Sequence, residues 1–527
     1  MANLPISSLP NVLPSGVTPN DLLVIVNYDT ALGETKNITA FDLQTYVNSG
    51  QTQLYEVGSG SGSTQRIGVN GNASGQYSVV SGGFNNTSDG SSSSIIGGTN
   101  NFSGGFGSII GGGRGNTTNC DYSFIGGGRG NTSSGYGSTV GGGRGNTSSC
   151  FYSTISGGKF NTSSGYYSTV SGGKCNTSNV VFTTIGGGTN NTAEGEGSVV
   201  GGGSNNTSGC NTGVNNHTTI GGGFCNNAFG FVSTIGGGTQ NTSSGYSSTV
   251  SGGNQNTIDS ITSSGYYVYG SSIGGGSFNT ISSYSGYYDS YGNTIAGGTC
   301  NTTLSSEYNG QTIGGGRNNT TNERSSTVGG GQFNSSIAGS STISGGLCNA
   351  ATGGSSTISG GRFNTSIGNC STVGGGYCNT SIGGHSTVGG GITNKSIGLC
   401  STIGGGRQNT SSCYSSTVSG GGRNTSSGNY STVGGGQFNS SIAGSSTISG
   451  GRCNTSINGC SAILGGQCNT AQHDCSFIVG SGIFSTAAKT LHINCLNIKD
   501  LPNETTIGLP LGTIFYNSTT CNLCVCL

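Results

Sequence analysis

Hydrophobic and polar residues alternate over short stretches that recur at a fixed interval along most of the chain. In the segment "YSTISGGKFNTSSGYYSTVSGG" (residues 152–173) the pattern Ser-Thr-Val/Ile returns after fifteen residues. Alternation over so few residues is typical of a short β-strand with one face buried. The Val or Ile of each stretch is expected to face inward and to stack on its counterpart in the next unit, as at Val140, Ile155, Val170 and Ile185.

The fixed interval extends over most of the sequence. Alignment on Gly-Gly-x-x-Asn gives 27 units, beginning with the unit of Asn72, and 21 of the 26 intervals are 15 residues long. A short constant period is typical of a solenoid. Fifteen residues suffice for two short strands and two tight turns, which make one circuit of a β-roll. We therefore predict an all-β parallel β-roll or β-helix solenoid of about 27 coils in residues 61–486, with small caps in residues 1–60 and 487–527.

Nearly every unit carries an Asn directly after the Gly-Gly-x-x stretch. Asn tolerates the left-handed backbone conformation and can hydrogen-bond to neighbouring backbone groups, so we expect it to form a turn ladder. Of the 27 units, 20 have this Asn in an N-x-S/T acceptor pattern for glycans, and six keep the Asn without the pattern. A structural role explains both groups, whereas glycosylation explains only the 20. The representative ladder residues are Asn131, Asn146, Asn161, Asn176, Asn364, Asn379, Asn409 and Asn424.

Composition limits the kind of core that the chain can form. The sequence has 109 Gly, and only 30% of its residues are hydrophobic. A thick globular core would require more apolar surface than this to offset chain entropy. We expect a single thin coil to need a cover on its apolar side, and three chains about an axis would supply one by symmetry. A homotrimer is therefore our hypothesis for the assembly.

Charge and hydropathy exclude further classes. The 16 basic and 16 acidic residues balance, so we expect no clustered positive field and no nucleic-acid partner. The N-terminus lacks the basic start and apolar run of a secretory signal, and no apolar stretch has the length of a membrane helix. Membrane insertion is not expected.

The 19 cysteines resemble a disulfide framework until they are placed on the repeat. Most cysteines at equivalent positions are two or more coils apart, which is too far for a disulfide. Two pairs lie on adjacent coils and could bond, Cys453 with Cys468 and Cys460 with Cys475. We expect the other cysteines to serve as small buried hydrophobic residues in a reducing compartment.

Four intervals are longer than the rest, and they cluster in residues 207–318. Three of these insertions are rich in tyrosine, which offers a large amphipathic contact surface at low entropic cost. Insertions in repeat arrays commonly lie on a functional face. We therefore expect receptor binding by Tyr266, Tyr267, Tyr269, Tyr284, Tyr287, Tyr288, Tyr291 and Tyr308.

Catalytic chemistry has little support in the sequence. The four histidines, His217, His385, His473 and His492, are scattered, and the acidic residues are not paired. The tail "CNLCVCL" permits a zinc interpretation, but no His lies near it and "LCVCL" alternates like a strand. We predict that the protein is not an enzyme and has no cofactor and no metal site.

The two ends resemble those of viral fibre proteins. "NDLLVIVNYDTALGETKNITAFDLQTYVNSG" (residues 20–50) reads as strand, turn, strand and a short helix from about Phe41. It resembles the N-terminal segment of fibre-like structural proteins of phages and large viruses, which docks the fibre to the particle. "GLPLGTIFYNSTTCNLCVCL" (residues 508–527) resembles the short β tip of phage fibre chains.

The repeats resemble the left-handed parallel β-roll heads of trimeric autotransporter adhesins, and they resemble still more the Gly-Gly-x-x-Asn-Thr arrays of viral fibres. Autotransporters carry a signal peptide and a C-terminal membrane barrel, which we do not find in this sequence. The resemblance implies a homotrimeric fibre on the virion surface, assembled in the host cytoplasm. Residues 1–60 would attach to the virion or tail, and the rod would bind a host surface glycan or protein.

Two other classes remain as alternatives. A non-viral extracellular adhesin or structural filament would have the same repeats. An ice-binding β-roll would use the Thr that recurs at Thr139, Thr154, Thr169 and Thr184, although the paired Thr-x-Thr pattern of such surfaces is missing.

Overall fold

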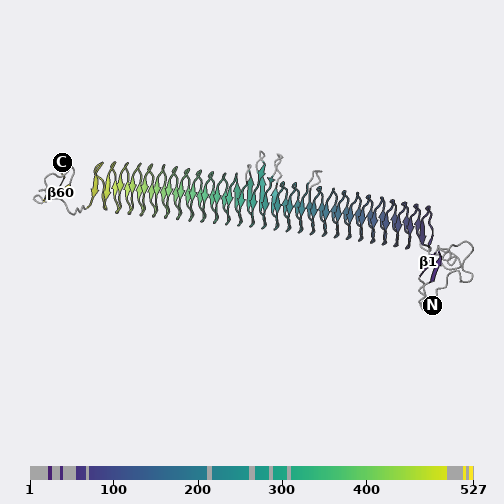
Figure 1. Cartoon of the computed structure of the whole chain (residues 1–527). Coiled ribbons are helices and arrows are strands. Elements are labelled where there is room, and N and C mark those ends of the chain that lie inside the picture. The colour runs from purple at the N-terminus through teal and green to yellow at the C-terminus, as the bar shows by residue number, and fades with distance from the viewer. Residues whose placement is uncertain are drawn as a thin grey trace, which may run out of the picture. The chain divides into compact units, whose positions relative to one another are not determined.

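The chain folds as a parallel β-solenoid, seen here in a computed structural model. The described residues are 22–25, 36–39, 55–66, 70–209, 216–259, 268–283, 289–305, 310–494, 514–517 and 522–525. They form strands and turns and no helix. Two units divide the chain, unit 1 at Met1–Tyr291 and unit 2 at Gly292–Leu527. The predicted fold class is confirmed, since the chain has about 27 parallel coils (Figure 1).

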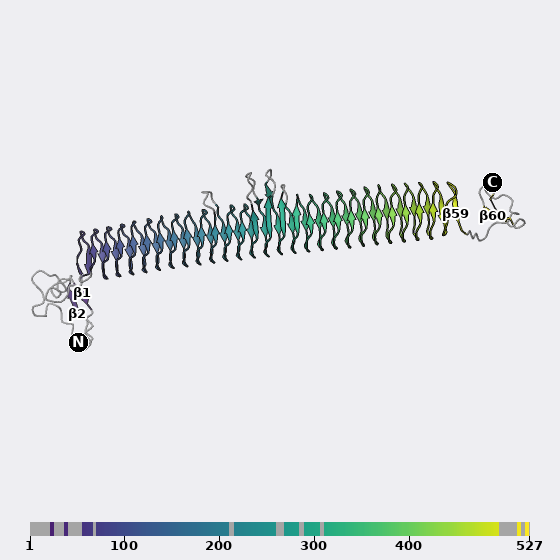
Figure 2. The same ribbon diagram turned by 180° about the vertical axis from the view of Figure 1, so that it is seen from behind.

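Most coils contribute two strands of two residues to two parallel sheets. Strand β14 (Thr139–Val140) pairs with β16 (Thr154–Ile155), and β15 (Thr147–Ser148) pairs with β17 (Thr162–Ser163). We call these two layers the Val/Ile sheet and the Ser sheet. The views from both sides show the coils of each unit following one another as successive rungs (Figure 1 and Figure 2). Residues that are 15 apart in sequence therefore become neighbours.

Both sheets run through each unit. In unit 1 the parallel strands of the Val/Ile sheet extend from β4 (Thr64–Arg66) through β6 (Val79–Val80) to β31 (Ser272–Ile273), and those of the Ser sheet from β5 (Asn72–Ala73) to β32 (Thr280–Ser283). In unit 2 they begin at β34 (Thr294–Ile295) and β35 (Thr302–Ser305). There the Ser sheet ends at β57 (Thr470–Ala471), and the Val/Ile sheet continues through β58 (Phe477–Val479) to β59 (Leu491–Ile493), beyond the predicted boundary at residue 486.

The turn from the Val/Ile sheet to the Ser sheet is made by glycine. Gly143 has φ 91°, and a Cβ there would collide with the carbonyl oxygen of Gly158 in the next coil. The following residue, Arg144, forms an isolated parallel bridge to Lys159. The next residue is left-handed in each coil, with φ 65° at Gly145 and 56° at Phe160. We expected the left-handed residue to be the ladder Asn, and this was wrong, because the Asn has to point inward while its predecessor turns outward.

The interior of a coil is half apolar and half polar. Val140 and Ile155 are fully buried on the Val/Ile side. On the Ser side the buried hydroxyls of Ser148 and Ser153 hydrogen-bond to each other at 2.7 Å. One chain thus encloses its own core, so the argument that a lean coil requires partner chains as a cover was wrong. The number of chains in the assembly stays a prediction.

Short antiparallel hairpins occur towards both ends. Strand β1 (Leu22–Ile25) pairs with β2 (Lys36–Thr39), and β60 (Ile514–Asn517) pairs with β61 (Asn522–Val525). The helix predicted from about Phe41 lies outside the described residues.

At the start of the solenoid the strand pairing changes from antiparallel to parallel. Strand β3 (Tyr55–Val57) pairs antiparallel with β4 (Thr64–Arg66), and β4 pairs in parallel with β6. In the next coil Asn72 pairs with Thr87, not with Asn86 as the sequence alignment assumed. Asn72 is exposed, so the Asn ladder begins at Asn86.

Candidate functional site

All four long intervals open at the same turn of the coil. This turn leads from the Ser sheet to the next strand of the Val/Ile sheet, and we call it the aromatic turn. In unit 1, for example, β29 (Thr257–Asp259) in the Ser sheet precedes the insertion and β31 in the Val/Ile sheet follows it. The segments that the structure does not describe, 210–215, 260–267, 284–288 and 306–309, all fall in this turn.

Two of the tyrosines predicted to bind a receptor lie in the described part of this turn. Tyr269 in β30 (Val268–Tyr269) pairs with Tyr291 in β33 (Ser290–Tyr291). Their rings stack with centroids 5.0 Å apart and an angle of 11° between planes. The ring of Tyr246, one coil earlier, lies 5.1 Å from that of Tyr269. The other six predicted residues lie outside the described residues: Tyr266, Tyr267, Tyr284, Tyr287, Tyr288 and Tyr308.

Ordinary coils of unit 1 carry a longer aromatic row in the same turn, which the sequence analysis missed. Ring centroids are 5.5 Å apart for Phe106 and Tyr122, 5.4 Å for Tyr122 and Tyr136, and 5.7 Å for Tyr136 and Phe151. Phe151 then stacks on Tyr166 at 5.2 Å, with an angle of 7° between planes. The signal was available in the sequence, because an aromatic residue ends many of the fifteen-residue units.

A second row runs beside the first. Tyr152 stacks on Tyr167 at 5.2 Å, and Tyr167 stacks on Phe182 at 5.4 Å. These residues have left-handed φ values of 54° to 58°, which direct the ring outward while the next residue, such as Ser153, points into the coil. The exposed fractions of the rings lie between 46% and 56%. The two rows together form what we call the aromatic edge: Phe106, Tyr122, Tyr136, Phe151, Tyr152, Tyr166, Tyr167 and Phe182.

The aromatic edge is suited to binding and offers few reactive groups. Its rings present flat apolar faces, and the tyrosine hydroxyls add hydrogen-bonding groups. His217 lies in the same turn, with its ring 6.5 Å from that of Phe231. Over the described residues, no group of three or more His, Cys, Asp and Glu side chains is arranged to hold a metal ion. Cys524 of the predicted strand "LCVCL" lies in β61, and Cys521 and Cys526 lie outside the described residues.

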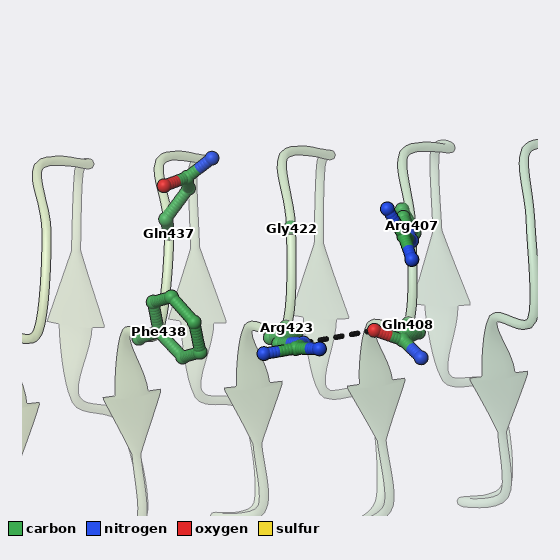
Figure 3. Close-up of a pocket in the computed structure, with 6 residues that line it drawn as sticks. All are labelled: Arg407, Gln408, Gly422, Arg423, Gln437 and Phe438. Atoms are coloured by element: carbon green, nitrogen blue, oxygen red, sulfur yellow. Dashed lines mark hydrogen bonds between the residues drawn. The ribbon is translucent and has the colours of Figure 1, made fainter.

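A shallow notch in unit 2 brings polar groups together on the outer face of the coil (Figure 3). Gly422 leaves a gap in the column between Arg407 and Gln437. Beside the gap Arg423 donates from Nε to Oε1 of Gln408 at 2.8 Å, and its guanidinium carbon lies 5.3 Å from the ring centroid of Phe438. The guanidinium is thus already held by its neighbours, and the notch is not the site that we favour.

The eight predicted ladder asparagines lie inside the solenoid. Each is fully buried, and its backbone N–H donates to the side-chain oxygen of the ladder Asn one coil earlier. Asn131, for example, also donates from Nδ2 to the carbonyl oxygens of Gly127 and Gly143, at 2.9 and 3.1 Å. A glycan on Nδ2 would have no room in this arrangement.

The cysteines were expected to be buried, and this was wrong. The 14 described cysteines from Cys120 to Cys475 are free thiols, and each is exposed or half-buried. The reason is local, because many of them occupy left-handed positions that direct the side chain outward, such as Cys175 at φ 56°. The four cysteines considered for disulfides, Cys453, Cys468, Cys460 and Cys475, are all exposed.

The threonines considered for ice binding form a single column. Thr139, Thr154 and Thr169 pair in register and are half-buried on the outer face of the Val/Ile sheet. Each strand there has only two residues, and the second points inward. No second Thr column stands beside the first within these strands, so the paired surface is not formed.

Comparisons with known proteins complete the description. Neither the models of known protein families nor the curated protein sequences gave a match to this chain. In the part of the chain that the structure describes, no helix has the length and apolar character needed to cross a membrane.

Proposed function

We propose that this protein is a structural fibre protein of a virus or phage particle, which attaches the particle to a host surface through the aromatic edge and the tyrosine insertions. The observation that carries the proposal is their common position. Four insertions and two rows of contacting rings, most of them exposed, all occupy the turn that follows the Ser sheet. A host surface glycan or protein is the proposed partner.

The scaffold suits such a binding edge. Each ring is fixed on a coil whose backbone is hydrogen-bonded to the coils before and after it, for example from Tyr152 N to Tyr136 O at 2.9 Å. Rings held in this way lose little conformational freedom on binding, so more of the contact energy appears as affinity. A row of equivalent rings also lets a repeating ligand contact several coils at once, which adds avidity.

The remaining parts of the proposal come from the sequence resemblance. Residues 1–60 would dock to the virion or tail, and residues 487–527 would form the neck and tip. The fibre would be a homotrimer that is assembled in the host cytoplasm and displayed on the virion surface. A native mass measurement would give the number of chains.

The test compares two sets of aromatic substitutions in the full chain. The first variant carries Tyr152→Ser, Tyr167→Ser and Phe182→Ser on the aromatic edge. The matched control carries Phe333→Ser, Phe363→Ser and Phe438→Ser, which remove rings of similar exposure at the other left-handed position of the coil. Circular dichroism checks that both variants fold. Binding is measured on an array of immobilised glycans and on intact cells of several host types.

We expect the first variant to lose binding and the control to retain it. Equal binding by both variants would contradict a role for the aromatic edge. If the wild-type protein binds nothing but grows end to end into filaments, the structural filament becomes the better interpretation.

A further inference from the structure

Five consecutive coils of unit 1 place a cation at the same outward position. Arg114, Arg129, Arg144, Lys159 and Lys174 are joined in series by parallel bridges, each residue two positions before its ladder Asn. We call them the basic column. Adjacent coils of a parallel sheet are about 4.8 Å apart, so the column presents one positive charge at each such step.

The charges of this column are not neutralised nearby. Arg114, Arg129, Arg144 and Lys174 are exposed and Lys159 is half-exposed. None of the five forms an ion pair within the described part of the chain. Asp121 is the one acidic residue between residues 90 and 193, and it lies in the aromatic turn, where its Oδ1 accepts a hydrogen bond from Phe106 N at 2.9 Å.

The fold does not require cations at this position. The coils on either side have Thr99 and Thr189 there, and their backbone bonds match those of the basic column. Thr99 N donates to Gly113 O at 2.8 Å, Arg144 N to Gly158 O at 2.9 Å, and Thr189 N to Gly203 O at 2.9 Å. Like charges in adjacent coils repel one another, so the column destabilises the solenoid when no ligand is bound.

The distribution of Lys and Arg along the sequence also sets these five residues apart. These five residues are the only Lys and Arg between Arg66 and Arg317. Their alignment in consecutive coils produces a single row of cations, which suits a ligand with a matching row of negative charges.

We propose that the basic column binds a linear anionic polysaccharide, with carboxylate or sulfate groups along an extended chain. The step between cations is close to the length of one sugar ring, so successive anionic sugars can meet successive coils. Phe160 adds an apolar surface beside the column, with the Nζ of Lys159 at 5.1 Å and the guanidinium carbon of Arg144 at 6.0 Å from its ring centroid.

Duplex DNA fits the column less well. It carries one charge for about every 1.7 Å of its axis, on two strands, and favours a broad basic surface. The basic column is one residue wide on a chain of zero formal net charge.

The basic column is also separate from the aromatic edge, because it precedes the Ser strand of each coil and the aromatic turn follows that strand. It therefore stands independently of the proposed attachment function.

The experiment measures binding of the full chain to three immobilised probes: polygalacturonate, dextran sulfate and duplex DNA, with neutral dextran as the blank. The test variant carries Arg114→Thr, Arg129→Thr, Arg144→Thr and Lys159→Thr. The control variant carries Arg317→Thr, Arg362→Thr, Arg407→Thr and Arg452→Thr, which removes the same charge from the same coil position where the cations are interrupted by neutral residues. Circular dichroism and thermal unfolding check the fold of each.

We expect the wild type to bind at least one acidic polysaccharide, with affinity that falls as salt is added. The test variant should lose roughly tenfold or more, since each exposed ion pair contributes modestly and four are removed. The control should lose much less. Equal losses in both variants would show a net-charge effect and overturn the proposal. Stronger binding to DNA than to either polysaccharide, or no binding to any probe, would also overturn it.

Discussion

The side-chain oxygen of Asn131 accepts a hydrogen bond from the backbone N–H of Asn146, 2.9 Å away in the next coil. Asn146 in turn donates from Nδ2 to Gly142 O of its own coil at 2.8 Å and to Gly158 O of the following coil at 3.0 Å. Through its backbone N–H and its side-chain amide, one buried Asn thus connects three coils. This repeated bond explains how a glycine-rich chain with few apolar residues holds a defined interior.

Asn146→Ala should destabilise these coils strongly. It leaves the carbonyl oxygen of Gly142 and the N–H of Asn161 without a partner, whereas Gly158 O keeps the hydrogen bond from Arg144 N. Each unsatisfied group costs about 1–3 kcal/mol, so we expect a loss of about 2–6 kcal/mol for the two. Urea unfolding gives the total, and hydrogen exchange should show the loss around residues 131–161. Thr147→Ala, at the outward-facing neighbour, should change little, and an equal loss there would contradict the ladder's role.

Gly143→Ala and Gly142→Ala should differ sharply in their effect on stability, although the two residues are adjacent. At Gly143 the backbone has φ 91°, and a Cβ would collide with Gly158 O and lie 2.6 Å from Nδ2 of Asn146. At Gly142 no heavy atom lies within 4 Å of the added Cβ. We expect a loss of about 3 kcal/mol or more for the first and nearly none for the second, measured by thermal unfolding. Similar midpoints for both variants would contradict the geometry of this turn.

Ile155→Ala should reveal how much the apolar half of the coil contributes. Ile155 is fully buried between Val140 and Val170, so its truncation leaves a cavity. Such substitutions cost about 2–5 kcal/mol. Thr154→Ala, one residue away on the outer face, is the control and should cost well under half as much. Denaturant titration of both variants provides the comparison.

Glycosylation should discriminate between two adjacent acceptor patterns. Asn205 and Asn206 both begin an N-x-S/T pattern, but Asn205 is exposed and Asn206 is fully buried with Nδ2 bonded to Gly202 O at 2.9 Å. When the folded protein is obtained from a secreting eukaryotic host, glycopeptide mass spectrometry should find glycan at Asn205 and none at Asn206. A glycan on Asn206 in folded protein would show that the ladder is not closed there.

Oxidation should link cysteines in adjacent coils and spare those two coils apart. Cys453 and Cys468 occupy equivalent exposed positions in consecutive coils, about 4.8 Å apart, which lies within the Cα separation of disulfides. Cys348 and Cys378 occupy the same column two coils apart, at roughly 10 Å. After mild oxidation we expect a Cys453–Cys468 peptide and no Cys348–Cys378 peptide. Before oxidation Cys453 and Cys468 should react with a maleimide in the folded protein, and protection of either would contradict their exposure.

The sequence by itself determined the solenoid, its period and much of its interior. Val140 and Ile155 could be assigned inward from alternation alone, and the role of the Asn in bonding to backbone followed from its persistence where the glycan pattern fails. These properties repeat from unit to unit, so the repetition itself makes them recognisable in the sequence. A polar interior was harder to foresee, because hydrophobicity does not reveal that Ser148 and Ser153 satisfy each other.

Only the tertiary structure decided which side chains become neighbours on the surface. Whether Phe160 or Asn161 takes the left-handed conformation determines which one points outward, and that choice also exposes the cysteines. Arg129 and Arg144 are 15 residues apart and belong to a chain of zero net charge, yet closing the coil places them one strand spacing apart. Net charge and composition are averages over the whole chain, whereas the solenoid brings the side chains at one repeat position together from coil to coil. For that physical reason the aromatic edge and the basic column emerge only when the coils are stacked.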